Sequence, residues 1–384
     1  MSRISDLLDK ARAATGFDDL GDDGFREGLE RLVASADREA RLNDAGRAMF
    51  DGQTVMLLTK RLEVEHWYAR HPEIDEQEIV APLMVLGLPR TGSTALHCLL
   101  GEDPAVRVMR NWESMNPCPP PETATYATDP RIAIMDEHMK RRDRMTPRMR
   151  QMLPSTSTSP TEDQLTMGYN FASQIFQASF RIPSYVHWLH HEADLEPTFR
   201  YVKRVLKLLQ WRCPPRRWRL KNPTYSMFIA ALDKVFPDAR YCMTHRDVAN
   251  VMPSVADLYY EMHKPNTDTV DKLWLGAINT EFGMLGMQRM IAFREAGHEH
   301  RFFDIHFAPF QKDPFPTLAR LYDFLGQAFT PEAEARMRAW RESTPRDKHG
   351  RHEYNGADYG LSTADLREKF RFYSERFAVP LGKD

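Results

Sequence analysis

The pattern of apolar and polar positions predicts a core in which strands alternate with helices. Short apolar runs of strand type begin at about residues 82, 217, 240 and 301. Between them apolar residues recur at helical spacing, and the same spacing continues from about Pro314 to Leu325. Strands that alternate with helices build a mostly parallel sheet that is covered on both faces. The pattern therefore predicts an α/β fold.

Two further regions are expected to be helical. Residues 1 to about 75 carry apolar positions such as Leu7, Leu8 and Leu32 with charged faces between them. We expect a helical N-terminal extension over 1–75, packed on an α/β domain of residues 76–384 or on a second subunit in a homodimer. Residues of about 122–212 are mostly of helical pattern and rich in aromatic side chains, most of which are expected to fill the core. We expect this stretch to be a mostly helical region that precedes the strand at about residue 217.

The most specific motif is the run from Leu86 to Thr94, Leu-Gly-Leu-Pro-Arg-Thr-Gly-Ser-Thr. Gly87 and Gly92 have the spacing of a Walker phosphate-binding loop, but Ser93 stands where that loop has its lysine. The apolar run before the loop and the helical pattern after it place the glycines at a strand-to-helix turn. Free backbone N–H groups and the helix dipole favour an anion there. The alternative is a turn that uses glycine only for its geometry.

This loop resembles the 5′-phosphosulfate loop of sulfotransferases that use 3′-phosphoadenosine 5′-phosphosulfate (PAPS). In that family a Pro-Lys/Arg-Ser/Thr-Gly-Ser/Thr-Thr run holds the 5′ end of the donor. The resemblance implies a P-loop-type parallel sheet flanked by helices, with PAPS bound by Arg90, Thr91, Gly92, Ser93 and Thr94. It also implies that the helical region of about 122–212 is an insertion that forms a cap over the acceptor pocket. PAPS has no γ-phosphate, which accounts for the missing lysine.

A second fragment, from Arg240 to Asp247, is of strand type and ends in charged residues. The family binds the 3′-phosphate of PAPS with an Arg at the end of such a strand and a Ser eight residues later. Arg246 and Ser254 have this spacing. A guanidinium binds phosphate through paired hydrogen bonds, and a hydroxyl adds a neutral donor. The resemblance therefore implies a 3′-phosphate site, with a structural ion pair of Arg246 with Asp247 or another carboxylate as the alternative.

A third fragment, Trp-Arg-Leu-Lys-Asn-Pro ending at Pro223, resembles the strand that brings a catalytic lysine, here Lys221, to the bridging oxygen of the sulfate. The cytosolic enzymes for phenols and steroids have Lys-x-His, but Pro223 stands at the His position and cannot accept a proton. The Lys-x-Pro motif resembles that of the bacterial and Golgi branch of the family, which includes the protein-tyrosine sulfotransferases. In that branch a Glu shortly after the first helix is the base. The matching residue is Glu113, for which a salt bridge with Arg110 is the alternative.

Two more segments bear on the site. Glu162 follows Pro160 in the first turn of an expected helix, where the dipole favours an anion. Many bacterial relatives have an acidic residue here, so Glu162 is a second candidate for the base, or a ligand for the acceptor. The basic run of residues 347–354 resembles the C-terminal loop of the family, which implies that Gly350 and Arg351 contact the 3′-phosphate. A solvated basic loop is the alternative.

The charge, the apolar runs and the cysteine spacing argue against nucleic-acid binding, a membrane span and a metal site. The net charge of −2 over 384 residues gives no general attraction to nucleic acid. The N-terminus has no apolar core of signal-peptide length and the chain has no run of about 18 apolar residues, so we expect a cytoplasmic protein without a membrane span. The four cysteines lack metal-type spacing, and no metal is predicted. The basic run at 138–144 is expected to be a solvated helix face, with an acidic acceptor or partner as the alternative.

Together these features predict a PAPS-dependent sulfotransferase that transfers the sulfuryl group to a hydroxyl, or an amine, of a small-molecule acceptor. Glu113 would take the proton, while Lys221 and Arg90 would neutralise charge on the oxygens around sulfur. The protein would supply position and cations rather than covalent chemistry, without Mg²⁺. A P-loop-type nucleotide or small-molecule kinase, which would need Lys in place of Ser93, and a non-catalytic nucleotide-binding relative remain alternatives. The sequence does not name the acceptor.

Overall fold

A parallel five-stranded sheet forms the centre of the computed structural model, which describes residues 3–214, 216–344 and 354–382. In these residues the strands are β1 Leu83–Gly87, β2 Val106–Arg107, β3 Arg217–Lys221, β4 Arg240–His245 and β5 Phe302–His306. Their order is β2-β3-β1-β4-β5, and every pairing is parallel. The predicted α/β fold and the four expected strands are confirmed. The two-residue β2 was not expected, because it is too short to show a periodic pattern.

The central strand β1 is buried along its whole length because helices cover both faces of the sheet. Alternate side chains of a strand point to opposite faces. Met84 and Leu86 accordingly join the larger apolar core, while Leu83 and Val85 join a second one. The helices that contribute to the second core are α4 Ser93–Leu100, α15 Phe307–Lys312, α16 Phe315–Phe324 and α17 Pro331–Ser343. Those that contribute to the larger core beside the sheet include α12 Ile229–Val235, α13 Val248–His263 and α14 Lys272–Phe293.

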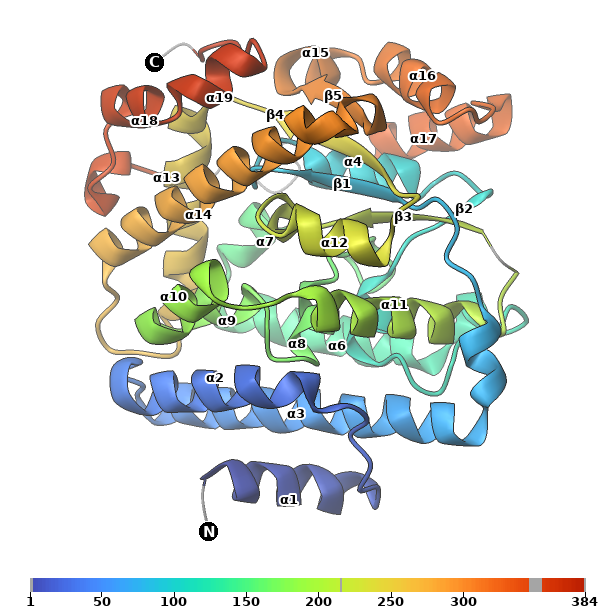
Figure 1. Cartoon of the computed structure of the whole chain (residues 1–384), viewed down its shortest axis with the longest axis vertical. Coiled ribbons are helices and arrows are strands. Elements are labelled where there is room, and N and C mark those ends of the chain that lie inside the picture. The colour runs from blue at the N-terminus through green and yellow to red at the C-terminus, as the bar shows by residue number, and fades with distance from the viewer. Residues whose placement is uncertain (1–2, 215, 345–353, 383–384) are drawn as a thin grey trace.

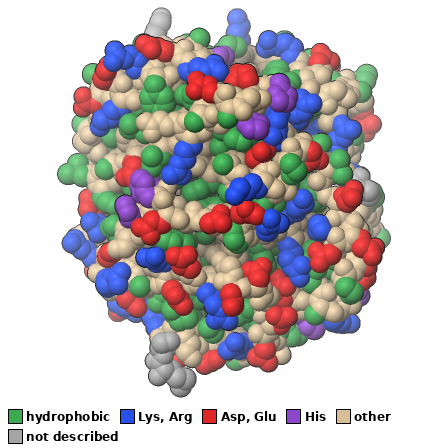
Figure 2. Space-filling view, in the orientation of Figure 1, with side chains coloured by type: hydrophobic (Ala, Val, Ile, Leu, Met, Phe, Trp, Pro, Cys, Tyr) green, Lys and Arg blue, Asp and Glu red, His purple; other side chains and the backbone are tan. Residues whose placement is uncertain are grey.

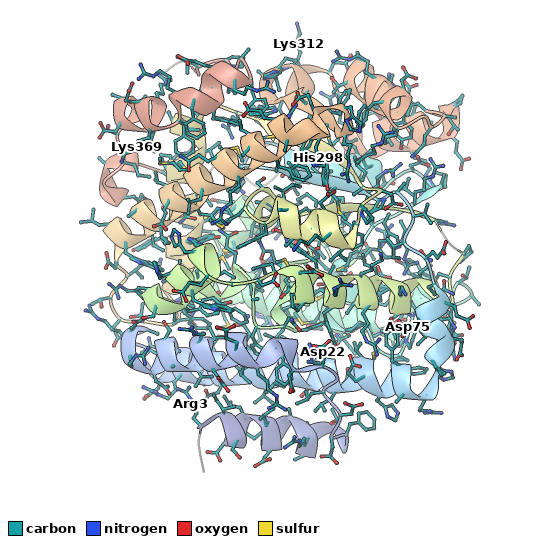
Figure 3. All side chains as sticks on the ribbon, in the orientation of Figure 1. Arg3, Asp22, Asp75, His298, Lys312 and Lys369 are labelled. Carbon is teal, nitrogen blue, oxygen red and sulfur yellow. The ribbon has the colours of Figure 1, made fainter. Side chains whose placement is uncertain are left out.

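The N-terminal extension is helical, as expected. Its helices α1 Arg3–Thr15, α2 Arg26–Glu39 and α3 Asp44–Arg70 form a layer at the end of the molecule far from the sheet (Figure 1). Side chains fill the space between this layer and the rest of the chain (Figure 3). Within the layer, Arg3 on α1 pairs with Asp51 of α3 at 2.5 Å. The domain boundary near residue 75 stays a prediction.

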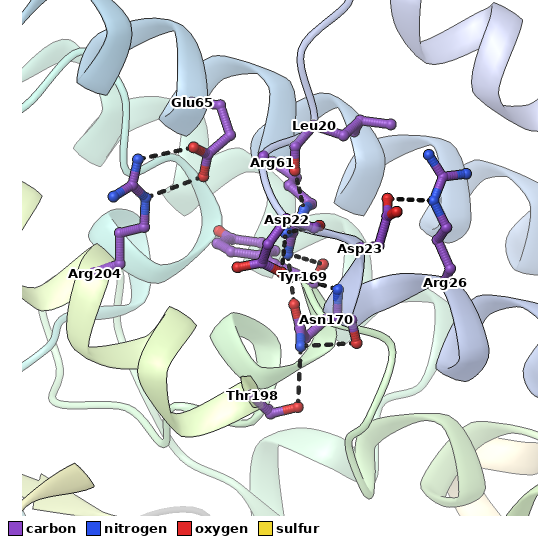
Figure 4. A network of polar contacts seen from close by, with 12 residues as sticks. Leu20, Asp22, Asp23, Arg26, Arg61, Glu65, Tyr169, Asn170, Thr198 and Arg204 are labelled. Carbon is purple, nitrogen blue, oxygen red and sulfur yellow. Dashed lines mark hydrogen bonds and ion pairs between the residues drawn. The ribbon is translucent and has the colours of Figure 1, made fainter. Parts of the chain in front are cut away.

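A buried arginine fastens this layer to the cap. The Arg61 side chain on α3 is 0% exposed. Its guanidinium donates to the carbonyl of Leu20 at 2.6 Å, to Oδ1 of Asn170 at 2.5 Å and to the carbonyl of Asp22 at 2.9 Å (Figure 4). It also stacks on the Tyr201 ring at 4.1 Å. Arg61 therefore joins three segments that are far apart in the sequence.

The cap is mostly helical, as expected, and lies between the N-terminal layer and the sheet (Figure 1). Its helices are α6 Pro130–Met145, α7 Met149–Met152, α8 Gln164–Gly168, α9 Ile175–Ser179, α10 Pro183–His191 and α11 Glu196–Gln210. The other helices are α5 Asn111–Met115, α18 Thr363–Lys369 and α19 Arg371–Arg376. Most of the cap aromatics are buried, as expected.

Charges on the surface are of mixed sign. Acidic and basic side chains are interspersed over the face shown in Figure 2. The basic run lies on α6, where Lys140 pairs with Glu137 and Arg142 with Asp143. Within the described residues, no helix combines the length and apolar character that a bilayer crossing requires.

Candidate active site

The glycine loop joins β1 to α4 through a turn that only glycine fits at two positions. Gly87 has a φ of +118°, and a Cβ there would lie 2.6 Å from the carbonyl oxygen of Thr244. Gly92 has a φ of +91°, and a Cβ there would lie 3.0 Å from the Phe307 ring. Helix α4 begins at Ser93, so its first N–H groups have no acceptor within the helix. The turn thus presents backbone donors and a positive dipole end, as an anion site needs.

The Arg90 guanidinium lies over this turn. Its Nε donates to Oγ of Ser254 at 3.2 Å, and an Nη donates to the carbonyl of Met152 at 2.8 Å. Burial lowers the pKa of Arg90, although the nearby Glu162 opposes that shift. No ion pair among the described residues includes Arg90. A desolvated cation without a carboxylate partner is costly, and a bound anion would remove that cost.

Arg246 and Ser254 both contact Arg90, while their role at a 3′-phosphate stays a prediction. Arg246 follows β4 and donates to the carbonyl of Arg90 at 2.9 Å, and its guanidinium lies 4.3 Å from the centre of the Phe307 ring. Ser254 is buried on α13. Asp247 does not form the alternative ion pair with Arg246. Its carboxylate caps the start of α13 and pairs with Arg367 at 2.9 Å.

The hydroxyl residues of the loop differ in what their side chains contact. Thr91 is buried, and its Oγ1 donates to the carbonyl of Leu88 at 2.7 Å and lies 2.6 Å from Oγ1 of Thr244. It therefore holds the loop on the end of β4. Thr94 is exposed, and its Oγ1 lies 3.4 Å from Nζ of Lys221. Ser93 is buried at the start of α4.

Lys221 ends β3 and points to the same place as the loop. Because β3 lies beside β1 in the parallel sheet, the ends of both strands meet at one edge. The Lys221 side chain is 6% exposed, and its Nζ donates to Oε1 of Glu162 at 2.5 Å. Glu162 is 34% exposed, so it keeps a face toward solvent.

Glu113 lies in a different environment. Its side chain is fully buried on α5, where Oε1 accepts from the Arg107 guanidinium at 2.7 Å and Oε2 accepts from the backbone N–H of Arg110 at 3.1 Å. The partner in the ion pair is thus Arg107, whereas Arg110 contributes its backbone. One carboxylate oxygen thus holds α5 against β2, and the other caps the start of α5. The role of Glu113 as base stays a prediction that this geometry does not favour.

The expected position of Glu162 in a helix needs correction. Helix α8 begins at Gln164, and Glu162 precedes it in a segment where Pro160 bridges Arg110. Asp163 at the helix start does not cap it, because its carboxylate accepts from Nδ2 of Asn222 instead. The helix dipole therefore gives no account of Glu162, whose charge is met by the Lys221 ammonium.

The basic C-terminal segment lies mostly outside the described residues, and Gly350 and Arg351 are among those left out. Tyr354, the last residue of the run, is described, and its hydroxyl donates to the carbonyl of Asn250 on α13 at 2.9 Å. Contacts of Gly350 and Arg351 stay predictions. Sequence reasoning missed Asp163 and Asn222, which carry no motif of their own.

Comparison with known proteins decides the family. The sequence model of the sulfotransferase family matches residues 82–331, which is more than half of the chain and includes the glycine loop, Lys221 and Arg246. The chain belongs to the sulfotransferase family. Its fold is similar to the crystal structure of sulfotransferase STF9 from Mycobacterium avium, with a TM-score of 0.93 and 31% identity over 100% of this chain and 99% of that one. For sulfotransferase STF1 from Mycobacterium tuberculosis the TM-score is 0.86 and the identity 28%, over 96% and 98% of the two chains.

This sulfotransferase also has curated relatives with a named acceptor. It is 27% identical over 254 residues to the omega-hydroxy-beta-dihydromenaquinone-9 sulfotransferase of Mycobacterium bovis, and equally to that of Mycobacterium tuberculosis. The match covers 64% of this chain and 62% of each relative, so it spans less than two thirds of their length.

Proposed function

We propose that this sulfotransferase moves the sulfuryl group from PAPS to a hydroxyl of a small-molecule acceptor. The observation that best supports PAPS as the donor is the position of Arg90. This desolvated cation belongs to the glycine loop and contacts both Arg246 and Ser254. The start of α4 would hold the 5′ end of PAPS, and Arg246 with Ser254 the 3′-phosphate. Arg90 and Arg246 are in direct contact with each other, and two neighbouring guanidinium groups suit a ligand with two anionic ends.

For the proton acceptor we propose Glu162 in place of Glu113. Glu162 is partly exposed and already at hydrogen-bond distance from Lys221, whereas Glu113 is fully buried with one oxygen paired to Arg107 and the other bonded to the backbone N–H of Arg110. The Glu162 carboxylate takes the proton of the acceptor hydroxyl as the new O–S bond forms. The S–O bond to the 5′-phosphate breaks, and its electron pair leaves on adenosine 3′,5′-bisphosphate. Lys221 neutralises the charge that grows on this leaving oxygen.

The cap side of the site supports an apolar alcohol as the acceptor. Met149, Met152 and Tyr259 belong to one apolar cluster, and Met152 is the residue whose carbonyl binds Arg90. Burial, and then the charge of Glu162, raise the pKa of Tyr259, which places this ring within electrostatic range of the proposed base. Methionine side chains repack readily around irregular apolar ligands. The curated relatives, named for a hydroxylated menaquinone, are consistent with such an acceptor.

One binding comparison and one transfer assay test this function. Adenosine 3′,5′-bisphosphate should bind more tightly than ADP, and labelled sulfate should pass from PAPS to at least one member of a panel of alkyl alcohols, isoprenoid alcohols and phenols. Phosphoryl transfer from ATP, or equal binding of ADP, would instead favour the kinase. Donor binding without transfer to any acceptor would favour a non-catalytic relative.

A further inference from the structure

A second carboxylate, Asp163, lies directly beside Glu162 and is 1% exposed. Its Oδ1 accepts from Nδ2 of Asn222 at 2.6 Å, and its Oδ2 accepts from the Tyr225 hydroxyl. Burial raises the pKa of Asp163 to about 6, although these two hydrogen bonds oppose the rise. A buried carboxylate is costly unless its oxygens are bonded, and both oxygens of Asp163 are.

The contacts of Asp163 belong to a row of hydrogen bonds between the cap and the end of β3. Asn222, which follows Lys221, accepts at its Oδ1 from Nε2 of Gln164 at 2.9 Å. Three consecutive cap residues thus bind the end of one strand: Glu162 binds Lys221, and Asp163 and Gln164 bind Asn222. Because Asn222 is fully buried, this anchor is shielded from water.

The cap segment is also held on its other side. The backbone N–H of Thr161 donates to the carbonyl of Met109, the residue before the Arg110–Pro160 bridge, at 2.9 Å. Glu162 lies between this attachment and that of Asp163. Its own side chain has several rotatable bonds and is partly exposed, so its backbone must be fixed if its carboxylate is to stay in one place.

We propose that Asp163 is a positioning residue that, through Asn222 and Tyr225, holds the cap segment so that Glu162 faces Lys221 at hydrogen-bond distance. This inference rests on the proposed function of Glu162 as proton acceptor. Asp163 does not touch the acceptor. Its effect is on the placement of the base, and a misplacement of about 1 Å costs on the order of 10²-fold in rate.

The test compares Asp163→Asn with Asp103→Asn in the full-length protein. Asp103 is a matched control because it is 5% exposed and its Oδ2 also accepts from a buried tyrosine, Tyr322, at 2.5 Å. Asp163→Asn should lower kcat by about 10- to 100-fold, because a base that is displaced by up to about 1 Å loses rate on that scale. Binding of adenosine 3′,5′-bisphosphate should stay nearly unchanged. Asp103→Asn should lower the Tm and leave kcat nearly unchanged.

A double-mutant cycle separates positioning from general stability. If Asp163 acts through Glu162, then Glu162→Gln combined with Asp163→Asn should be no slower than Glu162→Gln alone. Tyr225→Phe, which removes one of the two anchoring bonds, should lose less kcat than Asp163→Asn.

Two results would overturn the positioning role while leaving the base assignment in place: a kcat for Asp163→Asn equal to that of Asp103→Asn, or additive losses in the cycle. A fully active Glu162→Gln would remove the proposed base, and the positioning role with it.

Discussion

Nζ of Lys221 lies 2.5 Å from Oε1 of Glu162, where the end of β3 meets the cap. This pair joins two parts of the chain that have separate sequence signals, the strand that ends in Lys-Asn-Pro and the segment that follows Pro160. Glu113 lies in a closed pair with Arg107 instead. The two candidate carboxylates therefore have different partners, and they should respond differently to substitution.

Glu162→Gln keeps the size of the side chain and removes its basicity. We expect kcat to fall by about 10²- to 10⁴-fold with donor binding nearly unchanged. The loss should be larger for an alkyl alcohol than for an acidic phenol, because a phenol needs less help to ionise. Steady-state kinetics with both acceptors, together with a direct binding measurement, check this.

Glu113→Gln is the matched variant. It leaves the charge of Arg107 buried without its partner, so it should lower the Tm while the folded protein keeps most of its kcat. A folded but inactive Glu113→Gln next to an active Glu162→Gln would return the base role to Glu113.

Lys221→Ala should lower kcat far more than it weakens donor binding. The leaving oxygen is more negative in the transition state than in the bound donor, so a cation beside it acts mainly on the rate. Single-turnover kinetics and binding of adenosine 3′,5′-bisphosphate measure the two effects separately. Normal turnover with weaker binding would assign Lys221 to ground-state binding instead.

Arg246→Ala should weaken PAPS binding by roughly 1.5–3 kcal/mol, or about 10- to 150-fold, because it removes a charge-assisted hydrogen bond. The loss should be much smaller for adenosine 5′-phosphosulfate, which has no 3′-phosphate. Arg240→Ala at the opposite end of β4 is the control and should leave both affinities unchanged. Equal losses for both ligands in Arg246→Ala would contradict the 3′-phosphate assignment.

Arg61→Leu should cost about 3–5 kcal/mol of unfolding free energy, because it leaves the carbonyls of Leu20 and Asp22 and the side-chain oxygen of Asn170 without their donor. Arg26→Ala removes an exposed pair with Asp23 shown in the same view and should cost about 0–1 kcal/mol (Figure 4). Urea denaturation of both variants measures the difference. Similar small costs would show that the Arg61 contacts contribute little.

Acidification should destabilise the protein through His97. Its Nε2–H donates to the carbonyl of Arg219 at 2.9 Å, and burial lowers its pKa to about 3. The unfolded chain, with a pKa near 6.5, binds more protons between these values, so stability falls as the pH drops from about 6.5 toward 3. The loss from this group at pH 5 is about 2 kcal/mol.

Denaturation at pH 7 and pH 5 checks this prediction in His97→Gln, whose amide can still donate to the carbonyl but does not titrate in this range. The stability difference between the two pH values should shrink in this variant. The exposed His300→Gln should show the same difference as the unaltered protein. An unchanged difference in His97→Gln would contradict the assignment.

The fold, the glycine turn and the closeness of Arg246 and Ser254 to that turn could be predicted from sequence because their signals are local. Gly87 and Gly92 are required by one turn, and that turn is read from their spacing. Arg246 and Ser254 are separated by a strand end and the first turns of a helix, so their distance in sequence fixes their distance in space. The parallel sheet follows from strands that alternate with helices.

Tertiary packing decided the partners of the two candidate carboxylates, Glu113 and Glu162. Sequence spacing from the loop favoured Glu113, but its neighbour Arg107 on β2 binds it inside the core. Glu162 reaches Lys221 because Asp163 and Gln164 bind Asn222 across an interval of some 60 residues, which no local pattern encodes. The sequence by itself determined the strand-to-helix turn and the nearby placement of Arg246 and Ser254, since local backbone geometry and short spacings set both. Only the folded chain decided which carboxylate meets the lysine, because that contact depends on how the cap packs against the sheet.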